Sequence, residues 1–558
     1  MGVIQSKYSG KQHNKPLREK PSPTSLSNSF GEPIYFDAEF DVLVIGAGLV
    51  GSQAAAVSAN DGKSVVVLEK SSNEEYRAKT PSQGSLRGLR TVQQPNSLKH
   101  AIAESLKFFK KIETEENPIV YDSESSYLMC VKDPTVSLYL KQDLEHFYSK
   151  DPSELYEEYN YEDAKRIFGI NPPKKYAGII DVQPTGATRL NIDNLIDRCH
   201  QIVRQKGAVN FSAKILDYKK LSNDEGYYLK VQYIDNHGNK QIKKYCAKQL
   251  VLAPGNNIGQ TLVDLQKLHQ IDSVSTLKTP NDTIVTKDNT VLEIPKIFQG
   301  NNSFAVPQRT LYMRLPRDVE KKILVQGPKD SEPKPRFGAL YMLDVGKRNR
   351  LGFYMFFEKL DDPRDKTKKI WGLKIGYDPM SLIRTKNNNT DIKKLLDKQE
   401  KLIISFLNKI FDTDLFTAQN ILRRDNCEYP LTLHHHPIAY KAGPENHGLI
   451  MLAGAEGYGA MAAAGAYKAV LDPRSGNKSL DFIPILPAKT WCDRFQKHSP
   501  YTMHYSTARR SLDNARRDLE KAWGVEQKGY GCRWSLCPTT GWRGTVLGTG
   551  SNSFRTFC

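Results

Sequence analysis

The sequence predicts an α/β protein in which one domain is assembled from separate stretches of chain and a second domain is inserted between them. Three segments predict the first domain, since each passes from an apolar strand into a glycine turn: residues 41–70, 248–257 and 448–471. Strand-like alternation between them, clearest in "LGFYMFF" and "IWGLKIGY", predicts that the inserted domain is a mixed or antiparallel sheet.

The order of the segments predicts the domain boundaries. Residues 1–37 are rich in Ser, Pro, Lys and Asn and are expected to be a disordered basic leader. We assign the first domain to residues 38–125, 186–260 and 425–475, and the inserted domain to residues 126–185 and 261–424. Residues 476–558 form a C-terminal extension, in which the apolar spacing predicts an amphipathic helix over 506–523.

Composition limits the classes of function. The chain has 558 residues, of which 39% are hydrophobic and 25% charged, as in an ordinary soluble protein of two or more domains. Its net charge of +18 comes without a zinc-ligand array or an aromatic RNA-binding signature, so we predict a basic solvated surface and no nucleic-acid partner. Eight cysteines in so long a chain form no dense disulfide framework and favour a reducing compartment over secretion.

The N-terminus suggests contact with a membrane surface. No apolar core of a signal peptide and no uncharged apolar run of spanning length is present in the sequence. "MGVIQS" places Gly2 and Ser6 as N-myristoylation requires, and a basic segment follows: Lys7, Lys11, Lys15, Arg18 and Lys20. We therefore expect a cytoplasmic protein, or one attached peripherally from the cytosolic side; the alternative is a disordered leader without a lipid.

The first glycine turn predicts a dinucleotide site. In "VIGAGLVG", Gly46 permits a tight turn, Gly48 permits close approach to a pyrophosphate, and Gly51 permits close packing of helix on strand. The unpaired N–H groups at the start of the helix would face the phosphates. Glu69 ends the second strand, where an acid accepts the ribose hydroxyls.

Three features favour FAD over NAD as the cofactor. The glycine turn lies at the start of the folded region. A second turn, at Gly255, follows the apolar strand "LVLA" and suits a second backbone approach to the cofactor. A third, with Gly457 and Gly459, opens a small-residue helix whose positive end could face a flavin carbonyl and the charge of reduced flavin.

Taken in order from about Phe40 to Leu471, these segments resemble the monomeric sarcosine oxidase branch of the D-amino acid oxidase-like flavoproteins. The resemblance implies a Rossmann-type FAD-binding domain with an inserted substrate domain, and a ligand site between the two. In "QGSLRGLR" it implies that Arg87 lies near the isoalloxazine and Arg90 toward a substrate carboxylate. In "GAVNFSAKILDY" it implies that the backbone of Ile215 neighbours the adenine.

The same resemblance implies a role for Lys374, the lysine in "WGLKIGYD". By alternation alone, Lys374 lies either on a solvated face or in a buried site, where an unpaired ammonium is costly. The segment matches the family's strand that carries the oxygen-activating lysine. A fixed cation in a poorly solvated pocket stabilises the anion that forms when oxygen accepts an electron.

Some members of this family bind the flavin covalently through a cysteine, and the resemblance places Cys427 of "NCEYPLTLHHHPI" at that position. It implies a thioether to the 8-methyl carbon of the flavin. The alternatives are a buried free thiol, the usual state of a core cysteine, and the non-covalent binding that many relatives use.

The chain departs from the family pattern at two positions that bear on the substrate. Met461, which we place against the cofactor, stands where relatives commonly carry a basic residue, and Gln83 stands where a histidine is common. Arg90 would therefore hold a carboxylate alone, which puts a simple N-methyl amino acid in doubt. Tyr458 and Glu456 lie close to the expected flavin and could orient an amine; a solvated carboxylate is the alternative for Glu456.

These observations predict an FAD-dependent oxidase of the C–N bond of a secondary or primary amine, with hydrogen peroxide as a product. The substrate would be a small-molecule amine, such as an amino-acid derivative, and oxygen would be the acceptor. We expect no metal, because the consecutive His434, His435 and His436 alternate in direction along a strand. The alternatives are a dehydrogenase with a protein or quinone acceptor, and a non-catalytic flavoprotein scaffold attached to a membrane.

Overall fold

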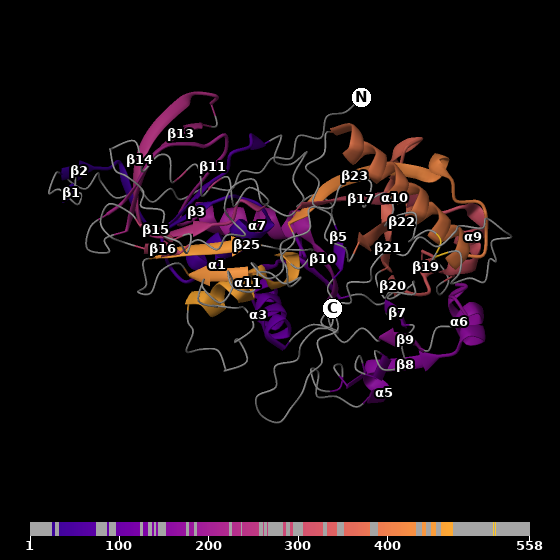
Figure 1. Cartoon of the computed structure of the whole chain (residues 1–558). Coiled ribbons are helices and arrows are strands. Elements are labelled where there is room, and N and C mark those ends of the chain that lie inside the picture. Colours follow the sequence, from indigo (N-terminus) through magenta and orange to yellow (C-terminus); the bar gives the residue numbers. More distant parts are fainter. Residues whose placement is uncertain are drawn as a thin grey trace, which may run out of the picture.

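Two large sheets, each with its own helices, lie side by side in the molecule (Figure 1). The structure is a computed structural model of the whole chain. It describes residues 25–27, 33–73, 86–88, 96–122, 127–131, 137–138, 141–142, 145, 152–174, 178–182, 187–221, 226–235, 237–255, 261, 265, 283–285, 291–293, 305–326, 332–342, 351–379, 389–430, 438–441, 448–453, 459–471, 517 and 519.

The first sheet has a parallel centre of five strands. In spatial order they are β11 (Gly207–Asn210), β4 (Val65–Leu68), β3 (Ala38–Ile45), β14 (Lys240–Leu252) and β25 (Leu449–Ala453). All four residues of "VVVL" in β4 are buried, as continuous apolar runs in parallel sheets usually are. The carboxyl ends of these strands therefore meet along one edge of the sheet.

Antiparallel strands extend this sheet on the β14 side. The first half of β14 pairs with β13 (Tyr227–Ile234), which pairs with β12 (Lys214–Lys220). The second half of β14 pairs with β25, and β25 also pairs with β24 (Ile438–Lys441). A strand of 13 residues thus joins both extensions to the centre of the sheet.

Four helices pack together over one face of this sheet: α1 (Leu49–Asn60), α3 (Asn96–Ile112), α7 (Ile192–Arg204) and α11 (Gly459–Leu471). Alanine and glycine let their backbones approach closely. A Cβ atom at Gly465 of α11 would overlap the carbonyl oxygen of Ala101 in α3, and the Gly465 N–H donates to Ser105 Oγ at 2.8 Å. The small-residue composition of α11 is therefore explained by its burial against its neighbours.

The second sheet also has eight strands and is antiparallel except where β20 runs parallel to β7. The order is β23 (Ile421–Pro430), β17 (Ala305–Arg314), β22 (Asp365–Pro379), β21 (Leu351–Asp362), β20 (Ala339–Met342), β7 (Tyr127–Val131), β9 (Gly178–Val182) and β8 (Tyr156–Tyr159). The mixed or antiparallel inserted sheet expected from the sequence is thus present.

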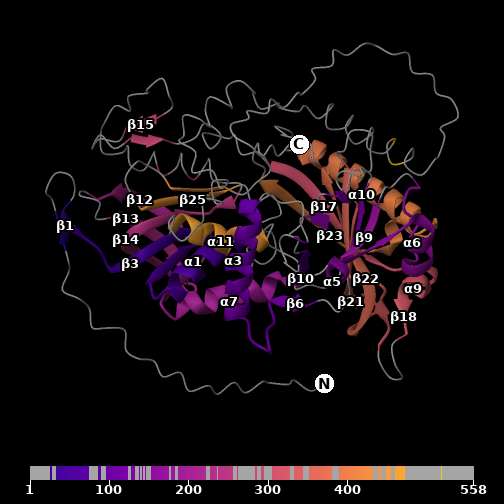
Figure 2. The ribbon, with the colours of Figure 1, turned by 90° about the horizontal axis from the view of Figure 1, so that it is seen from below.

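The long helix α10 (Asn389–Ile410) covers one face of the second sheet (Figure 2). Its apolar side chains pack on those of the central strands; the Phe406 ring stacks on that of Phe353, with centroids 4.0 Å apart. Two shorter helices, α6 (Tyr161–Phe168) and α9 (Arg317–Ile323), enclose the same core. Because this face is a closed apolar core, a ligand site in this sheet would lie on the opposite face.

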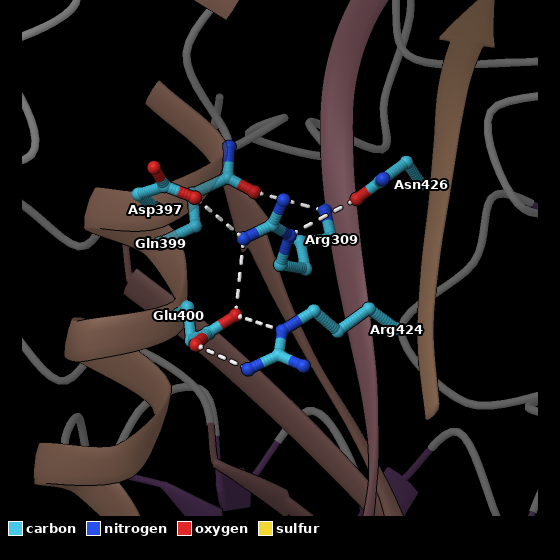
Figure 3. Close-up of polar contacts among 6 residues, drawn as sticks. All are labelled: Arg309, Asp397, Gln399, Glu400, Arg424 and Asn426. Atoms are coloured by element: carbon cyan, nitrogen blue, oxygen red, sulfur yellow. Dashed lines mark hydrogen bonds and ion pairs between the residues drawn. The ribbon is translucent and has the colours of Figure 1, made fainter. Parts of the chain in front are cut away.

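A polar network fixes α10 to the edge of the second sheet (Figure 3). Arg309 on β17 is largely buried, and its guanidinium reaches Asp397 at 2.9 Å, Glu400 at 3.0 Å and Asn426 of β23 at 3.0 Å. Glu400 also accepts two hydrogen bonds from Arg424 of β23. The network connects α10 to the edge strand β23 and its neighbour β17 through charge-assisted hydrogen bonds, which are stronger than neutral ones.

A three-stranded antiparallel sheet lies between the two large sheets in both views (Figures 1 and 2). It consists of β5 (Leu86–Gly88), β10 (Ala187–Asn191) and β6 (Val120–Asp122).

The remaining elements are short: β1 (Ser25–Ser27), β2 (Pro33–Tyr35), α5 (Pro152–Leu155), β15 (Thr283–Val285), β16 (Val291–Glu293), β18 (Leu324–Val325), β19 (Lys334–Pro335) and a 3-10 turn, η4 (Ala418–Asn420).

The described residues bear on the expected boundaries at three places. Strand β23 stays in the second sheet as far as Pro430, opposite Ala305, so the chain returns to the first sheet later than residue 425. Within the leader expected to be disordered, β1 and β2 pair through Leu26 and Ile34. Of the expected helix 506–523, Arg517 and Leu519 are described, and Leu519 is buried in the core beneath α10.

No helix among the described residues is long and apolar enough to cross a bilayer. Gly2 and the basic residues that follow it lie outside the described residues, so peripheral membrane attachment stays a prediction.

Candidate functional site

The first glycine turn connects β3 to α1 at the carboxyl edge of the parallel strands. Gly46 has a φ of +104°, a conformation that side chains disfavour, and a Cβ atom there would overlap the carbonyl oxygen of Ala253. A Cβ atom at Gly51 would overlap the carbonyl oxygen of Gly46. Ala253 ends the strand that leads to the second turn at Gly255, so two of the three expected turns lie side by side.

Glu69 is fixed against this turn. Its carboxylate accepts hydrogen bonds from the N–H of Ala47 at 2.8 Å and the N–H of Ser71 at 3.0 Å. The N–H of Ala213 donates to the Glu69 carbonyl at 2.8 Å, which places Ile215, two residues further on, beside the same strand end. Glu69 and Ile215, which the sequence places on the ribose and adenine side of the cofactor, therefore lie close together in the fold.

Buried polar side chains support the turn from below. Ser52 donates from Oγ to the Ala47 carbonyl at 2.6 Å, and its Oγ lies 2.9 Å from Nε2 of His200 on α7. His200 is 3% exposed. Since the Ser52 hydroxyl proton is used on Ala47, Nε2 of His200 is assigned as the donor to Ser52 Oγ. Glu69 and Ser52 thus hold Ala47 through its N–H and its carbonyl group.

The third glycine segment is tied to the first through Gln53. Its Nε2 donates to the Gly459 carbonyl at 2.9 Å, and its Oε1 accepts from the N–H of Ala464 at 3.0 Å. The Gln53 side chain is fully buried, so these hydrogen bonds replace those that water would make. The start of α11 is therefore fixed relative to the start of α1.

This arrangement fits a dinucleotide. Gly48 precedes α1 and supplies no side-chain cap, so the first N–H groups of the helix face outward at the end that attracts a phosphate. The backbone at Gly46 and Gly51 is packed too tightly for a side chain, as in the tight glycine turns that bind a pyrophosphate. Glu69 lies one strand away, at the end of β4.

The second sheet contributes a buried lysine. Lys374 on β22 is 1% exposed and lies opposite Tyr312 on β17 and Phe356 on β21. Its Nζ is 5.2 Å from the centre of the Tyr312 ring. The sequence left Lys374 either on a solvated face or in a buried site. The structure shows that it is buried, on the face of the sheet opposite α10.

The three-stranded sheet connects the two halves of the site at this same face. Gly88 of β5 packs on the rings of Tyr341 and Phe356, where a Cβ atom would overlap the Tyr341 hydroxyl. Arg189 of β10 donates from its guanidinium to the Phe357 carbonyl at 2.8 Å. The loop strand that includes Arg87 is thus held directly above the sheet that includes Lys374.

Charged groups are buried where these sheets meet. Burial lowers the pKa of the Arg189 guanidinium, and the nearby Glu358 carboxylate opposes this shift. The Arg189 Nε atom is buried and has no hydrogen-bond partner among the described residues. A buried donor of this kind is costly unless a ligand or water satisfies it, which is common at binding sites.

Part of the expected site lies beyond what the structure describes. For Arg87 and Cys427 the backbone is described: Arg87 pairs with Leu190, and Cys427 pairs with Gln308. Gly459 and Met461 are buried at the start of α11. The other expected residues lie outside the described residues: Gln83, Arg90, His434, His435, His436, Glu456, Gly457 and Tyr458. Within the described residues, no group of three His, Cys, Asp or Glu side chains could hold a metal ion.

Sequence reasoning missed several polar residues that the structure places at the site. Ser52 and Gln53 interrupt an otherwise small and apolar helix, and that interruption is a signal that could have identified them. Tyr354 gave no such signal. Its hydroxyl lies over Gly376 and within 3.5 Å of Thr310 Oγ1, on the same face as Lys374, because β21 pairs with β22 in this register.

Comparisons with known proteins agree with this geometry. A family model described as FAD-dependent oxidoreductase matches residues 41–472. No curated protein matches the sequence. Among solved structures, a point mutant of NikD, an unusual amino acid oxidase essential for nikkomycin biosynthesis, has a TM-score of 0.50 at 15% identity, with 79% of this chain and 95% of that chain covered.

Two further structures are similar at lower scores. L-Proline dehydrogenase from P. horikoshii has a TM-score of 0.49 at 15% identity and covers 82% of this chain and 98% of its own. Glycine oxidase from Geobacillus kaustophilus has a TM-score of 0.47 at 13% identity, with 79% and 96% covered. At these identities the likeness concerns the fold alone.

Glu69 provides a test of the cofactor site. We expect Glu69→Gln to lower the FAD content of the purified protein at least about fivefold, because an amide accepts fewer hydrogen bonds from the turn and the ribose and lacks the charge. The ratio of flavin absorbance to protein absorbance measures the effect.

The matched control is Glu113→Gln. Glu113 also accepts two backbone N–H groups, from Ile119 and Val120, but it lies at the end of α3 away from the glycine turn. Its replacement should leave the FAD content unchanged. Equal loss in both variants would mean that Glu69 acts on folding and not on the cofactor.

Proposed function

The chain belongs to the family of FAD-dependent oxidoreductases, and on this premise we propose that it oxidises the C–N bond of a secondary or primary amine with oxygen as the electron acceptor. The observation that carries the proposal is the buried Lys374, placed on the ligand-side face of the second sheet. The substrate class we propose is a small amino-acid derivative. The net reaction converts amine and oxygen into imine and hydrogen peroxide, and water then hydrolyses the imine to a carbonyl compound and the released amine.

Each of the two large sheets would contribute a different part of the site. The first sheet would hold the FAD through Gly46, Gly48, Gly51 and Glu69, with the helix start of α1 at the phosphates. When bound, the flavin would accept a hydride equivalent from the amine carbon and later pass the electrons to oxygen. Arg90 would orient a carboxylate of the substrate, and Arg87 would lie near the flavin ring; both roles follow from the family resemblance.

Lys374 would act on the oxygen half of the reaction. Oxygen becomes an anion when it accepts an electron, and a fixed ammonium nearby lowers the energy of that anion. The interaction is large because water is excluded, as the 1% exposure of Lys374 indicates. No general base is required if the amine binds in its neutral form.

Met461 bears on the choice of substrate. It is 5% exposed and packs in the core beneath the first sheet, at the helix start where relatives commonly carry a basic residue. A side chain without charge cannot bind the substrate carboxylate there. We therefore propose an amine whose carboxylate is held by a single arginine, or one in which another polar group takes its place.

Reduction of the flavin by amines tests the function. We expect an amine from a panel of N-alkyl amino acids and primary amines to bleach the 450 nm band of the protein under anaerobic conditions. Admission of air should restore the band and release one hydrogen peroxide per flavin. Bleaching that only a quinone or protein acceptor reverses would indicate a dehydrogenase, and no bleaching by any amine would refute the proposal.

Lys374→Met tests the role of the buried cation. Stopped-flow measurement should show that reoxidation of the reduced flavin by oxygen slows at least about 100-fold, since removing a preorganised electrostatic group costs that much or more. Reduction by the amine should change less than about threefold. The matched control is Lys359→Met, on the neighbouring strand at the surface, which should alter neither rate.

Cys427 is proposed to bind the flavin through a thioether to its 8-methyl carbon. Acid precipitation of the protein should leave the yellow colour in the pellet, and Cys427→Ser should release it into the supernatant. Cys130→Ser is the control, because burial raises the pKa of the Cys130 thiol to about 12 and leaves it without nucleophilic thiolate. Wild-type flavin that dissolves on precipitation would refute the thioether.

A further inference from the structure

Lys374 is the centre of a row of three side chains that crosses three strands. Tyr312 on β17 and Phe356 on β21 are its register partners, and directly opposite residues project from the same face of a sheet. Each of the three side chains is buried to 98% or more. Lys374 therefore lies between two aromatic residues of neighbouring strands.

The Tyr312 ring is shared by two cations. Lys374 Nζ is 5.2 Å from the ring centre, and Cζ of Arg423, on β23, is 3.8 Å from it. Strand register explains the arrangement, because Arg423 is the partner of Tyr312 on its other side. A cation over the face of an aromatic ring is attracted to it, and the attraction increases when water is excluded.

Arg423 is separately held. Its guanidinium is ion-paired with Asp425 at 3.0 Å, and it is about half exposed. Although burial works against the charged form, Tyr312 and Asp425 raise the pKa of the Arg423 guanidinium. Arg423 thus remains charged while it lies over the ring that Lys374 also approaches.

Strand β22 gives Lys374 no side-chain neighbour of its own on this face. The residues two positions away on either side are Gly372 and Gly376. The space above Gly376 is filled by Tyr354, whose hydroxyl a Cβ atom would overlap. Lateral support for the flexible lysine stem therefore comes from the rings on neighbouring strands.

We propose that Tyr312 is a positioning residue for Lys374, and that the face of its ring holds the ammonium at a fixed point on the ligand-side face of the sheet. This inference rests on the proposed function of Lys374 in the reaction with oxygen. A lysine has a long flexible stem, and its charge stabilises a developing anion efficiently only when it is held in place beforehand. The attraction between the ammonium and the face of the ring supplies that constraint and favours the charged form of the lysine.

The kinetic test uses two substitutions of Tyr312. Tyr312→Phe keeps the ring and removes the hydroxyl, whereas Tyr312→Met removes the ring and leaves a smaller, flexible apolar side chain. We expect reoxidation by oxygen to slow at least about tenfold in Tyr312→Met and less than about threefold in Tyr312→Phe. Flavin reduction by the amine should stay within about threefold in both.

The matched control is Trp371→Leu. The Trp371 ring lies under Lys359 Nζ at 4.8 Å, on β22 and its neighbour β21, where both residues are half-buried. This variant also loses an aromatic ring beneath a lysine, and reoxidation should be unaffected. Slowing in Trp371→Leu equal to that in Tyr312→Met would show a general effect of sheet destabilisation and would overturn the inference.

A second readout needs no turnover. In protein with ¹³C at the lysine ε position, the Lys374 signal is identified by its loss in Lys374→Met. Ring currents should shift this signal upfield in the wild type and in Tyr312→Phe, and the shift should disappear in Tyr312→Met. A wild-type Lys374 signal at the position of exposed lysines would overturn the inference even if Tyr312→Met did not fold.

The outcomes separate this inference from the proposed function. If Lys374→Met reoxidises at the wild-type rate, the role of Lys374 fails, and the positioning role fails with it. If reoxidation is slow in Lys374→Met but normal in Tyr312→Met, the positioning role of Tyr312 is excluded and the role of Lys374 stands. If Tyr312→Phe is as slow as Tyr312→Met, the hydroxyl and not the ring is required, and the inference is overturned.

Discussion

The close approach of two backbone turns at the carboxyl edge of the first sheet is the constraint on which the cofactor site depends. Gly46 lies so near the Ala253 carbonyl that no side chain fits between them. This approach brings the carboxyl ends of β3 and β14 together. The start of α1 therefore lies beside the second glycine turn. Ser52 and Glu69 maintain it by binding Ala47 from two sides, and Gln53 extends it to α11.

The second half of the site depends on a different kind of contact. The loop strand β5 is placed over the second sheet by the fit of Gly88 on Tyr341 and Phe356 and by the bond from Arg189 to the Phe357 carbonyl. These contacts join β5 and β10 of the small sheet to β21, the strand beside Lys374. The small sheet therefore links the sheet of the glycine turns to the sheet of Lys374, as the proposed function requires.

The fold class could be predicted from the sequence because it depends on steric rules with a short sequence range, and the family could be predicted because several segments resemble its members. Gly46, Gly48 and Gly51 follow an apolar strand within six residues, and no long-range information is needed to interpret them. The bridge from Gln53 to Gly459 could not be predicted, since it joins residues 406 positions apart. Tyr312 was missed for the same reason: its neighbours Lys374 and Arg423 are defined by strand register, which the alternation of a single strand does not reveal.

Burial of Lys374 has a free-energy cost, and contacts elsewhere in the same strands offset it. Removing an ammonium from water costs on the order of several kcal/mol unless other interactions compensate. The ring of Tyr312 compensates in part, and the opposite face of the same strands supplies much more, because Leu373 and Ile375 alternate with the lysine and pack in the core beneath α10. The Arg309 network further binds α10 to β17 and β23, the strands that present Tyr312 and Arg423. A locally unfavourable charge persists because the surrounding sheet is stabilised on its other face, as is usual for functional groups that folding alone would not favour.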